Sequence, residues 1–144
     1  MAEETCKQLN VDLSGQVAIV TGASQGLGKA CAMELARNGA RVACLARNAD
    51  KLAEAVTAIE EAGGQASAFS VDVTDRESVD RVVDQIVEEW GSVDILVNNA
   101  GITRDALLPR MSDEDFDDVI NTNLRGSFLF MRAVSKHMMS ARYG

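Results

Sequence analysis

A glycine-rich segment near the start of the chain has the composition of an anion-binding turn. Residues 21–28 have the sequence TGASQGLG, with glycines at positions 22, 26 and 28. Glycine permits tight turns and close approach of the backbone to a ligand. The N-terminus of a helix that follows such a turn offers N–H donors and positive potential. The spacing therefore predicts a site for a phosphate or pyrophosphate group.

Two other phosphate-binding motifs do not fit this spacing. Three residues and then one residue separate the glycines, which differs from the GxGxxG dinucleotide motif. A P-loop needs Gly-Lys followed by Ser or Thr, but here Gly28 and Lys29 come one residue late and precede Ala30. A glycine-rich turn also occurs for steric reasons without any ligand, so the flanking elements must decide between the two interpretations.

The flanking residues predict a strand before this turn and a helix after it. Residues 17–20 form a short apolar run typical of a strand. Leu27, Cys31 and Leu35 then recur at helical spacing, and the helix is expected to stop at 38–39. This context favours the ligand-binding interpretation of the glycines.

The same alternation continues along the chain and is typical of βαβ units. Further strands are predicted at 41–45, 66–71 and 93–97. Asn48 is the expected N-cap of the second helix, which should end at 63–64. Thr74 and Glu77 have the spacing of a capping box at the start of the third helix.

The third helix shows the clearest apolar stripe, and the segment after the fourth strand predicts two more helices. The stripe consists of Val79, Val82, Val83, Ile86, Val87 and Trp90. In the fourth strand, apolar residues in succession should face both sides of a buried parallel sheet. Ser112 could cap a short helix with Phe116, Val119 and Ile120, and a longer helix with Phe128, Met131 and Met138 follows.

Arg47 stands where a dinucleotide site distinguishes its cofactors. Sites for NAD place an acid at the end of the second strand, about twenty residues after the glycines, to hold the ribose hydroxyls. Here that strand ends in Leu45, Ala46 and Arg47, without an acid. A guanidinium binds phosphate in bidentate geometry, so the residue favours NADP(H) over NAD(H). The alternative is that Arg47 is only a solvated loop residue.

Composition excludes several other classes of protein. A net charge of −8 opposes nonspecific nucleic-acid binding. The chain has no leader-like start and no uncharged run of about 20 residues that could cross a bilayer, so we expect no membrane partner and a cytoplasmic location. Cys6, Cys31 and Cys44 lack CxxC spacing and are expected to be buried thiols, with no disulfide and no metal. A triad hydrolase is disfavoured because GxSxG is absent and His137 is the sole histidine.

Four motifs in order resemble the short-chain dehydrogenase/reductase family. TGASQGLG is similar to the family's TGxxxGxG turn, and residues 98–101 have its NNAG motif after the fourth strand. Asp72 and Val73 stand where the family lines the adenine pocket, and Asn123 falls on its active-site Asn. The resemblance covers about 13–144. The stretch NNAGITRDALLPRMSDEDF is especially similar to the ketoacyl-carrier-protein reductases of fatty-acid synthesis.

The resemblance implies one α/β domain over 1–144, a Rossmann-type doubly wound parallel sheet with strand order 3-2-1-4. The fold is expected to stop after the fourth strand and the following long helix. Its implied cofactor is NADP(H), and the implied cofactor-binding residues are Gly22, Ser24, Gln25, Gly26, Leu27, Gly28, Arg47, Asn48, Asp72, Val73, Asn99, Ala100 and Gly101.

Within that implied site, individual roles follow from the family. Ser24 and Gln25 would contact phosphates, and Asn99 and Gly101 would lie against the nicotinamide-side ribose. Many NADP-dependent relatives have Arg where Gln25 stands, which leaves more of the 2′-phosphate recognition to Arg47. The alternative for Asn99 is that it stabilises the sheet edge through backbone hydrogen bonds.

The family's chemistry is hydride transfer from the nicotinamide to a ketone. A Tyr supplies the proton, a Lys lowers the pKa of that Tyr, and a Ser holds the carbonyl oxygen. These three residues are expected beyond Gly144, since Tyr143 has no Lys four positions later. Only Asn123 remains, which the family uses to position a water beside the Lys. We expect negligible reductase activity from the isolated chain.

Two functional hypotheses remain open. The chain is either the N-terminal portion of an NADPH-dependent ketoacyl-carrier-protein reductase or a noncatalytic nucleotide-binding or subunit-association module. An exposed fourth strand and apolar residues near Phe128 and Met131 favour a homo-oligomer or association with a missing C-terminal half. Residues 121–144 hold four bases and no acid. By the resemblance, one of them, Arg142, would lie near an acyl-carrier protein; alternatively these bases suit a helix C-terminus.

Overall fold

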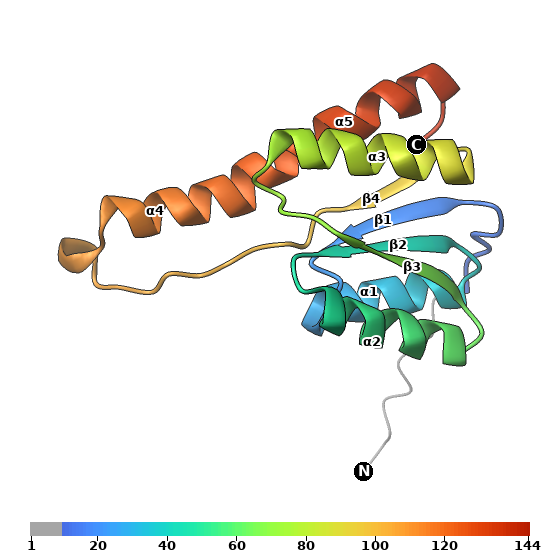
Figure 1. Cartoon of the computed structure of the whole chain (residues 1–144), viewed down its shortest axis with the longest axis horizontal. Coiled ribbons are helices and arrows are strands. Elements are labelled where there is room, and N and C mark those ends of the chain that lie inside the picture. Colours follow the sequence, from blue (N-terminus) through green and yellow to red (C-terminus); the bar gives the residue numbers. More distant parts are fainter. Residues whose placement is uncertain (1–9) are drawn as a thin grey trace, which may run out of the picture.

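The computed structural model describes residues 10–144 and shows a four-stranded parallel sheet with helices on both faces (Figure 1). The strands are β1 (Val17–Thr21), β2 (Arg41–Ala46), β3 (Gln65–Ser70) and β4 (Ile95–Val97). The helical segments are α1 (Gly26–Arg37), α2 (Ala49–Glu61), α3 (Arg76–Trp90), η1 (Leu108–Arg110), α4 (Asp113–Val119), the π segment η2 (Ile120–Arg125) and α5 (Gly126–Ala141). The strand order β3-β2-β1-β4 and the Rossmann-type fold confirm the prediction.

The register of the sheet brings the ends of all four strands to one edge. Thr21 at the end of β1 lies beside Leu45 of β2, and Ala46 lies beside Ser70 of β3. On the other side of β1, Val20 pairs with Val97, the last residue of β4. Because every pair is parallel, the four loops that follow the strands gather at this edge, as ligand sites in such sheets require.

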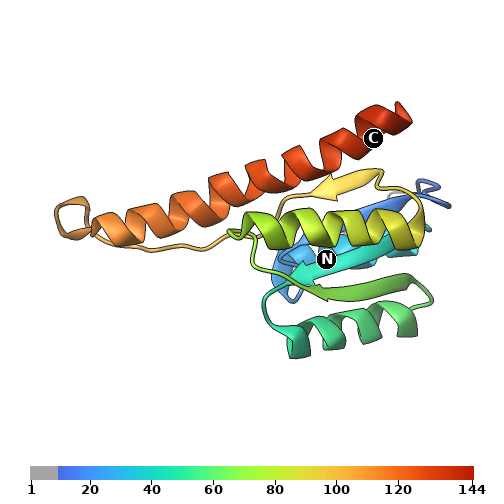
Figure 2. The same cartoon turned by 45° about the horizontal axis from the view of Figure 1, so that its top comes forward.

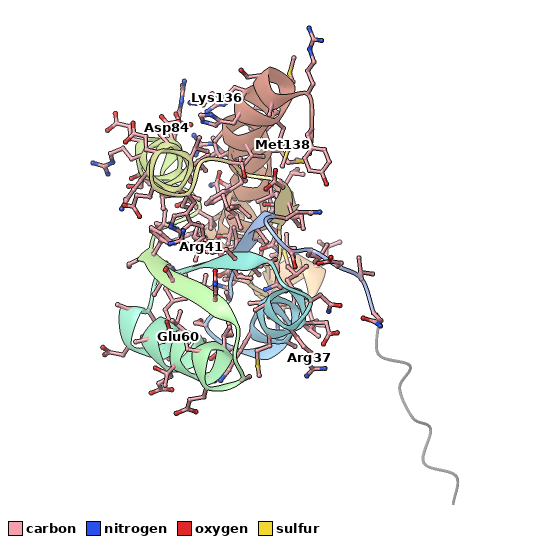
Figure 3. All side chains as sticks on the ribbon, turned by 90° about the vertical axis from the view of Figure 1, so that its right-hand side faces the viewer. Arg37, Arg41, Glu60, Asp84, Lys136 and Met138 are labelled. Carbon is pink, nitrogen blue, oxygen red and sulfur yellow. The ribbon has the colours of Figure 1, made fainter. Side chains whose placement is uncertain are left out.

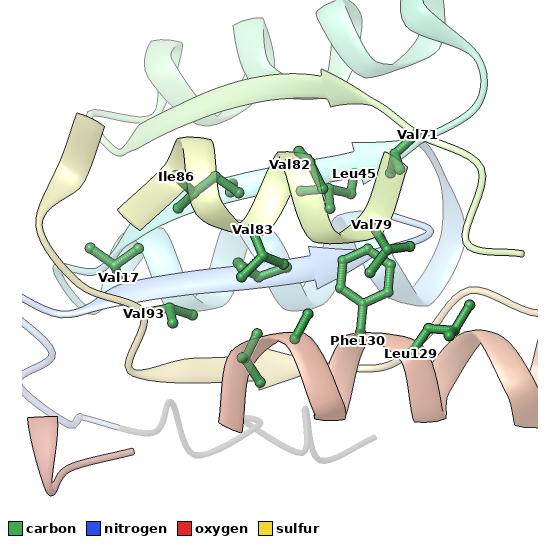
Figure 4. Packing of buried hydrophobic residues seen from close by; sticks show 14 residues of the cluster. Val17, Leu45, Val71, Val79, Val82, Val83, Ile86, Val93, Leu129 and Phe130 are labelled. Atoms are coloured by element: carbon green, nitrogen blue, oxygen red, sulfur yellow. The ribbon is translucent and has the colours of Figure 1, made fainter. Parts of the chain in front are cut away.

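Two apolar layers hold the sheet between the helices. Alternate residues of β1 face opposite sides, so Ile19 packs toward α3 and α5, and Val20 toward α1 and α2. Phe130 of α5 is fully buried and points toward Val79 of α3 (Figure 4). Each large side chain buried in this way stabilises the fold by roughly 1.5 to 3 kcal/mol, so the predicted stripe of α3 docks it on the sheet.

Helix α1 buries a different face from the one that its largest apolar residues indicate. Gly28, Ala32 and Ala36 are buried, whereas Leu27 is 78% exposed. Cys31 is exposed as well, which makes the expected burial of its thiol wrong. A helix that lies close to the sheet needs small side chains at the contact, and this requirement outweighs hydrophobicity as a guide to the buried face.

The other two cysteines have different outcomes. Cys44 is a buried free thiol in β2, as predicted, and burial raises its pKa to about 12. A thiol with this pKa stays protonated at neutral pH and is a poor nucleophile. Cys6 lies outside the described residues.

Two predicted helix caps form and one does not. The side chain of Asn48 accepts a hydrogen bond from the Lys51 N–H (3.0 Å), and that of Ser112 accepts one from the Asp115 N–H (3.1 Å). The predicted capping box at Thr74 is wrong. The Thr74 hydroxyl donates to Asp72 Oδ1 (2.7 Å), and α3 begins one residue later, with Asp75 as its N-cap.

Strand β4 is shorter than predicted because the side chain of Asp94, and not a backbone carbonyl, accepts the first hydrogen bond from β1. Asp94 Oδ2 accepts a hydrogen bond from the Val17 N–H (2.7 Å), and the Asp94 N–H donates to the Val17 carbonyl (2.9 Å). Regular pairing therefore starts only at Ile95. Ile95 and Leu96 pack on opposite faces, as predicted, but the strand is only half-buried.

The two helices predicted after β4 form one long rod. The helices α4 and α5 join through the π segment without an intervening turn, and the α4 end projects beyond the sheet (Figure 2). At the other end, Lys136 and His137 of α5 contact the Asp84 carboxylate of α3, both at 2.9 Å (Figure 3). Among residues 10–144, no helix combines the length and apolar character that crossing a bilayer demands.

Candidate functional site

A cavity of about 620 Å³ lies at the edge where the four strands end. The connections after β1, β2, β3 and β4 all contribute to its wall. The residues that line it are Gly22, Ser24, Gln25, Gly26, Ala46, Arg47, Asn48, Lys51, Val71, Asp72, Val73, Thr74, Asn99, Ala100, Gly101, Ile102, Arg104, Asp118 and Thr122.

Every cofactor residue predicted from the sequence lines this cavity except Leu27 and Gly28. Leu27 faces away from the protein and is largely exposed. Gly28 is buried beneath the turn, where a Cβ would overlap the Gly22 carbonyl oxygen and the Asn99 amide nitrogen. Gly28 therefore shapes the turn without forming its surface.

The turn after β1 presents the N-terminus of α1 to the cavity. Gly22 and Gly26 have φ angles of 67° and 57°, in the left-handed region that favours glycine. The side chain of Gln25, the N-cap residue, makes no capping hydrogen bond, and the first turn of α1 contains no acid. The first N–H groups of the helix are thus available for an anion.

Thr21 and Asn99 join the first and fourth loops beneath the cavity. The Thr21 hydroxyl accepts hydrogen bonds from the N–H groups of Asn99 and Ala100, both at 3.0 Å. The Asn99 side chain donates to the carbonyl oxygens of Thr21 (3.2 Å) and Gly22 (3.3 Å). These contacts agree with the alternative role of Asn99 at the sheet edge. Thr21 was not predicted as a site residue, although its buried hydroxyl follows from its place at the end of an apolar strand.

Asn123 holds the loop after β4 and contributes no atom to the cavity wall. Its side-chain oxygen accepts from the Ile102 N–H (2.8 Å), and its amide nitrogen donates to the Ile102 carbonyl (3.0 Å). A Cβ on Gly101 would lie 3.2 Å from the same side-chain oxygen, which explains the small residue there. Asn123 belongs to the π segment, a conformation frequent at functional sites.

Three cations and two acids border the cavity: Arg47, Lys51, Arg104, Asp72 and Asp118. Arg104 lies 3.7 Å from a carboxylate oxygen of Asp118 and from one of Asp115. The Asp72 carboxylate accepts hydrogen bonds from Thr74. Sequence reasoning missed Lys51, although a lysine in the first turn of α2, just after Arg47 and the cap, signals a second cation beside the strand end.

The lining fits a nicotinamide dinucleotide. Free helix N–H groups at the glycine turn suit a pyrophosphate, and Arg47 and Lys51 suit a further phosphate. Val71 and Val73 supply an apolar wall beyond β3, and Asp72 supplies a hydrogen-bond acceptor between them. This fit rests on the composition of the cavity, which combines anion-binding groups of the first two loops with amide and small residues of the fourth.

Comparison with known proteins links this architecture to named relatives. The chain is 42% identical over 132 residues to the 3-oxoacyl-(acyl-carrier-protein) reductase FabG of Thermotoga maritima, a match that covers 92% of this chain and 54% of the relative. The chain thus spans about half the length of the curated relatives it matches.

Two solved structures show the same fold with a cofactor bound. A metagenomic short-chain oxidoreductase in complex with NADP has a TM-score of 0.88 and 38% identity, over 92% of this chain and 60% of that one. An NAD+-bound xylitol dehydrogenase has a TM-score of 0.88 and 36% identity, over 91% of this chain and 51% of that one. Both NADP, which carries a 2′-phosphate, and NAD+, which lacks it, therefore occur among structures of this shape.

The family model described as short chain dehydrogenase matches residues 16–144, from the lead-in to β1 through the end of α5. Together with the strand order, the glycine turn and the Asn99 loop, this match shows that the chain belongs to the short-chain dehydrogenase family.

Proposed function

We propose that this chain is the cofactor-binding portion of an NADPH-dependent oxidoreductase that reduces a 3-oxoacyl thioester on acyl-carrier protein in fatty-acid synthesis. The observation that carries the proposal is the cavity into which the N-terminus of α1 opens, with Arg47 at its rim. The similarity to the FabG reductase supports the substrate, and the NADP complex of a structural relative supports the cofactor.

In this proposal each loop contacts one part of the cofactor. Ser24, Gln25 and the N–H groups of the glycine turn bind the pyrophosphate, and Arg47 and Asn48 lie at the adenosine ribose. Asp72 and Val73 form the wall of the adenine pocket. Asn99, Ala100 and Gly101 lie against the nicotinamide-side ribose. The bound nicotinamide supplies the hydride.

We propose further that residues 1–144 bind the cofactor but do not turn over substrate alone. Asn123 is the sole member of the proposed catalytic group among these residues, and its side chain is committed to Ile102. Tyr143 follows the far end of α5, about 30 Å along the helix axis from Asn123 at 1.5 Å per residue. It is not the proton donor in this proposal.

Calorimetric titration of the chain with NADPH and with NADH tests the proposed cofactor. We expect both to bind, with NADPH tighter, and Arg47→Met to weaken NADPH about tenfold while leaving NADH almost unchanged. Absence of heat with both cofactors would refute the proposed site. Equal affinities for the two would refute the NADP preference alone.

A second candidate, a noncatalytic nucleotide-binding or association module, is favoured by the side-chain commitment of Asn123. Mixing the chain with a C-terminal half of a reductase of this family, then following NADPH oxidation with a 3-oxoacyl thioester, separates the two candidates. Turnover only in the mixture supports the reductase. Binding without turnover in a correctly assembled mixture supports the module.

Two partner contacts belong to the same proposal. Arg142 is exposed at the end of α5, where its backbone is left-handed with a φ of 54°, and it could meet an acidic carrier protein. Titrating the assembled mixture with carrier protein should give weaker binding for Arg142→Glu than for the wild type. Association of two copies, or of this chain with a C-terminal half, would cover the exposed apolar residues of the rod.

A further inference from the structure

Lys51 reaches from α2 to the phosphate-binding turn of α1. Its ammonium donates a hydrogen bond to Gln25 Oε1 at 2.9 Å, although the two residues are 26 positions apart in the sequence. Gln25 is the N-cap of α1, and Lys51 lies in the first turn of α2. The contact spans the gap between two loops that line the cavity.

The backbone around this contact is held on both sides. The Ala23 N–H donates to the Leu45 carbonyl (3.1 Å), which ties the glycine turn to the end of β2. The Asn48 side chain accepts from the Lys51 N–H and sets the start of α2. Arg47, directly after β2, and Lys51, in the first turn of α2, therefore have fixed backbone positions beside the glycine turn.

The partner of Lys51 leaves its charge intact. Gln25 is neutral, so the hydrogen bond orients the ammonium without neutralising it, and two of its three donors stay available. Within residues 10–144, neither Lys51 nor Arg47 forms an ion pair with a carboxylate. Arg104, the remaining cation of the cavity, is balanced by Asp115 and Asp118.

We propose that Lys51 is a specificity-determining residue that binds the adenosine 2′-phosphate together with Arg47. This inference rests on the proposed function. The end of β2 is where dinucleotide sites recognise the 2′ position of the adenosine ribose. Arg47 directly follows this strand, and Lys51 lies four residues further on, in the first turn of α2. A compact ammonium held by Gln25 adds a point charge to the planar fork of Arg47. Gln25 thus acts as a positioning residue for the cation.

Binding measurements on the full chain with two pairs of ligands isolate the contribution of the 2′-phosphate. NADPH is compared with NADH, and adenosine 2′,5′-bisphosphate with adenosine 5′-monophosphate, by titration calorimetry at low salt. Lys51→Met should weaken NADPH and the bisphosphate about tenfold and the other two less than twofold. Lys51→Arg should retain most of the discrimination because it keeps the charge.

Lys29→Met is the matched control, because Lys29 lies on α1 outside the cavity lining and its loss changes the net charge equally. It should leave all four affinities within twofold. Equal weakening of all four ligands by Lys51→Met would overturn the inference and assign Lys51 to the adenosine 5′-phosphate, which all four share, or to the shape of the turn. Unchanged affinities would overturn it as well.

The outcome for Arg47 separates this inference from the proposed function. If the wild type prefers NADPH, Arg47→Met abolishes the preference and Lys51→Met leaves it unchanged, the proposed function stands and the assignment of Lys51 fails. If the wild type binds neither cofactor, both fail. Circular dichroism of each variant confirms that these exposed substitutions leave the fold intact.

Discussion

At the scale of single residues, hydrogen bonds from side chains replace the backbone pairing of the sheet where β1 and β4 end. Thr21 is 2% exposed, and its hydroxyl accepts the N–H groups of two successive residues of the fourth loop. Asn99 returns two hydrogen bonds to the end of β1. The floor of the cavity is therefore formed by protein contacts before any ligand arrives.

Replacing Thr21 by Val should destabilise the chain by about 1 to 2 kcal/mol, because the change leaves two partly buried N–H groups without an acceptor. Val keeps the shape of Thr, so packing is almost unchanged. Urea unfolding followed by circular dichroism measures the difference. Thr103→Val, at an exposed site, is the control and should stay within 0.5 kcal/mol of the wild type, as surface substitutions usually do. Equal effects of the two variants would contradict the role of the Thr21 hydroxyl.

Asn123→Ala should release the loop after β4. The variant loses both hydrogen bonds to Ile102, and amide exchange in 101–105 should become faster while the exchange of β1 stays slow. Asn121→Ala is a matched control in the same π segment. Asn123→Asp keeps the acceptor but loses the donor, so its exchange rates should be intermediate. Unchanged exchange in Asn123→Ala would show that the hydrogen bonds of Asn123 to Ile102 do not hold this loop.

At the scale of elements, periodicity predicts where helices and strands lie better than it predicts which face they bury. The strand order and most element positions follow from apolar runs alternating with amphipathic stretches. The buried face of α1 does not, because close contact with the sheet selects Gly28 and Ala32 over Leu27. Hydrophobic periodicity indicates which side chains are apolar, but it does not tell how closely the helix approaches the sheet.

Two other differences between prediction and structure, at Thr74 and at the π segment, also have local causes. The Thr74 hydroxyl has a competing acceptor in Asp72, which displaces the predicted capping box. The π segment depends on how α4 and α5 meet the loop after β4, so one-dimensional spacing predicts two separate helices instead. Nearly all of the cofactor residues predicted from the motifs line the cavity. Lys51 could be recognised as a lining residue only once the structure placed the loops after β1 and β2 side by side.

Enlarging the buried face of α1 tests this account of its packing. Ala32→Leu should destabilise the chain by about 1 to 3 kcal/mol, because the added atoms have no space at the sheet. Ala30→Leu makes the same change on the exposed side of the helix and should be close to neutral. Denaturant midpoints of both variants measure the effect. If Ala30→Leu destabilised the chain more than Ala32→Leu, the buried face of α1 would be the one that its large apolar residues predict.

The contact between α3 and α5 should weaken in acid. Hydrogen bonds from Lys136 and then from His137 are the main causes that lower the pKa of Asp84 below its usual 3.8. A lowered carboxylate pKa stabilises the fold above the unfolded pKa, and this contribution disappears as pH falls from about 4 through the folded value. The pair is exposed, so the effect is below about 1 kcal/mol.

Asp84→Asn should therefore lower the free energy of unfolding slightly at pH 7, and its difference from the wild type should shrink as the pH falls below about 4. Thermal unfolding across this range measures the difference, and Asp117→Asn, at an exposed position of α4, is the control. A difference between wild type and Asp84→Asn that persists unchanged in acid would contradict the linkage.

At the scale of the whole molecule, the rod formed by α4, the π segment and α5 exposes an apolar surface. Its exposed large apolar residues are Phe116, Ile120, Leu124, Phe128, Met131 and Met139. The strand β4 is also an edge of the sheet within residues 10–144. Contiguous apolar surface of this kind usually marks an interface.

We predict that the chain self-associates at micromolar concentration. In sedimentation velocity, the wild type should be larger than a monomer, and the double variant Leu124→Glu with Met131→Glu should shift toward the monomer. Val11→Glu removes an exposed apolar residue elsewhere and should leave the distribution unchanged. A compact wild-type monomer throughout the concentration range would refute the prediction.

The π segment also sets which changes of length the rod can accept. A π turn contains one residue more than an α turn, so deleting a single residue between Ile120 and Arg125 would let α4 and α5 continue as an ordinary helix. The deletion would leave α4 and α5 at nearly the same relative rotation, because the π turn holds its extra residue within about one turn, but the residues inside the segment would change their angle around the axis. Asn123 would then turn away from Ile102, and substitutions here should prove far milder than shortening.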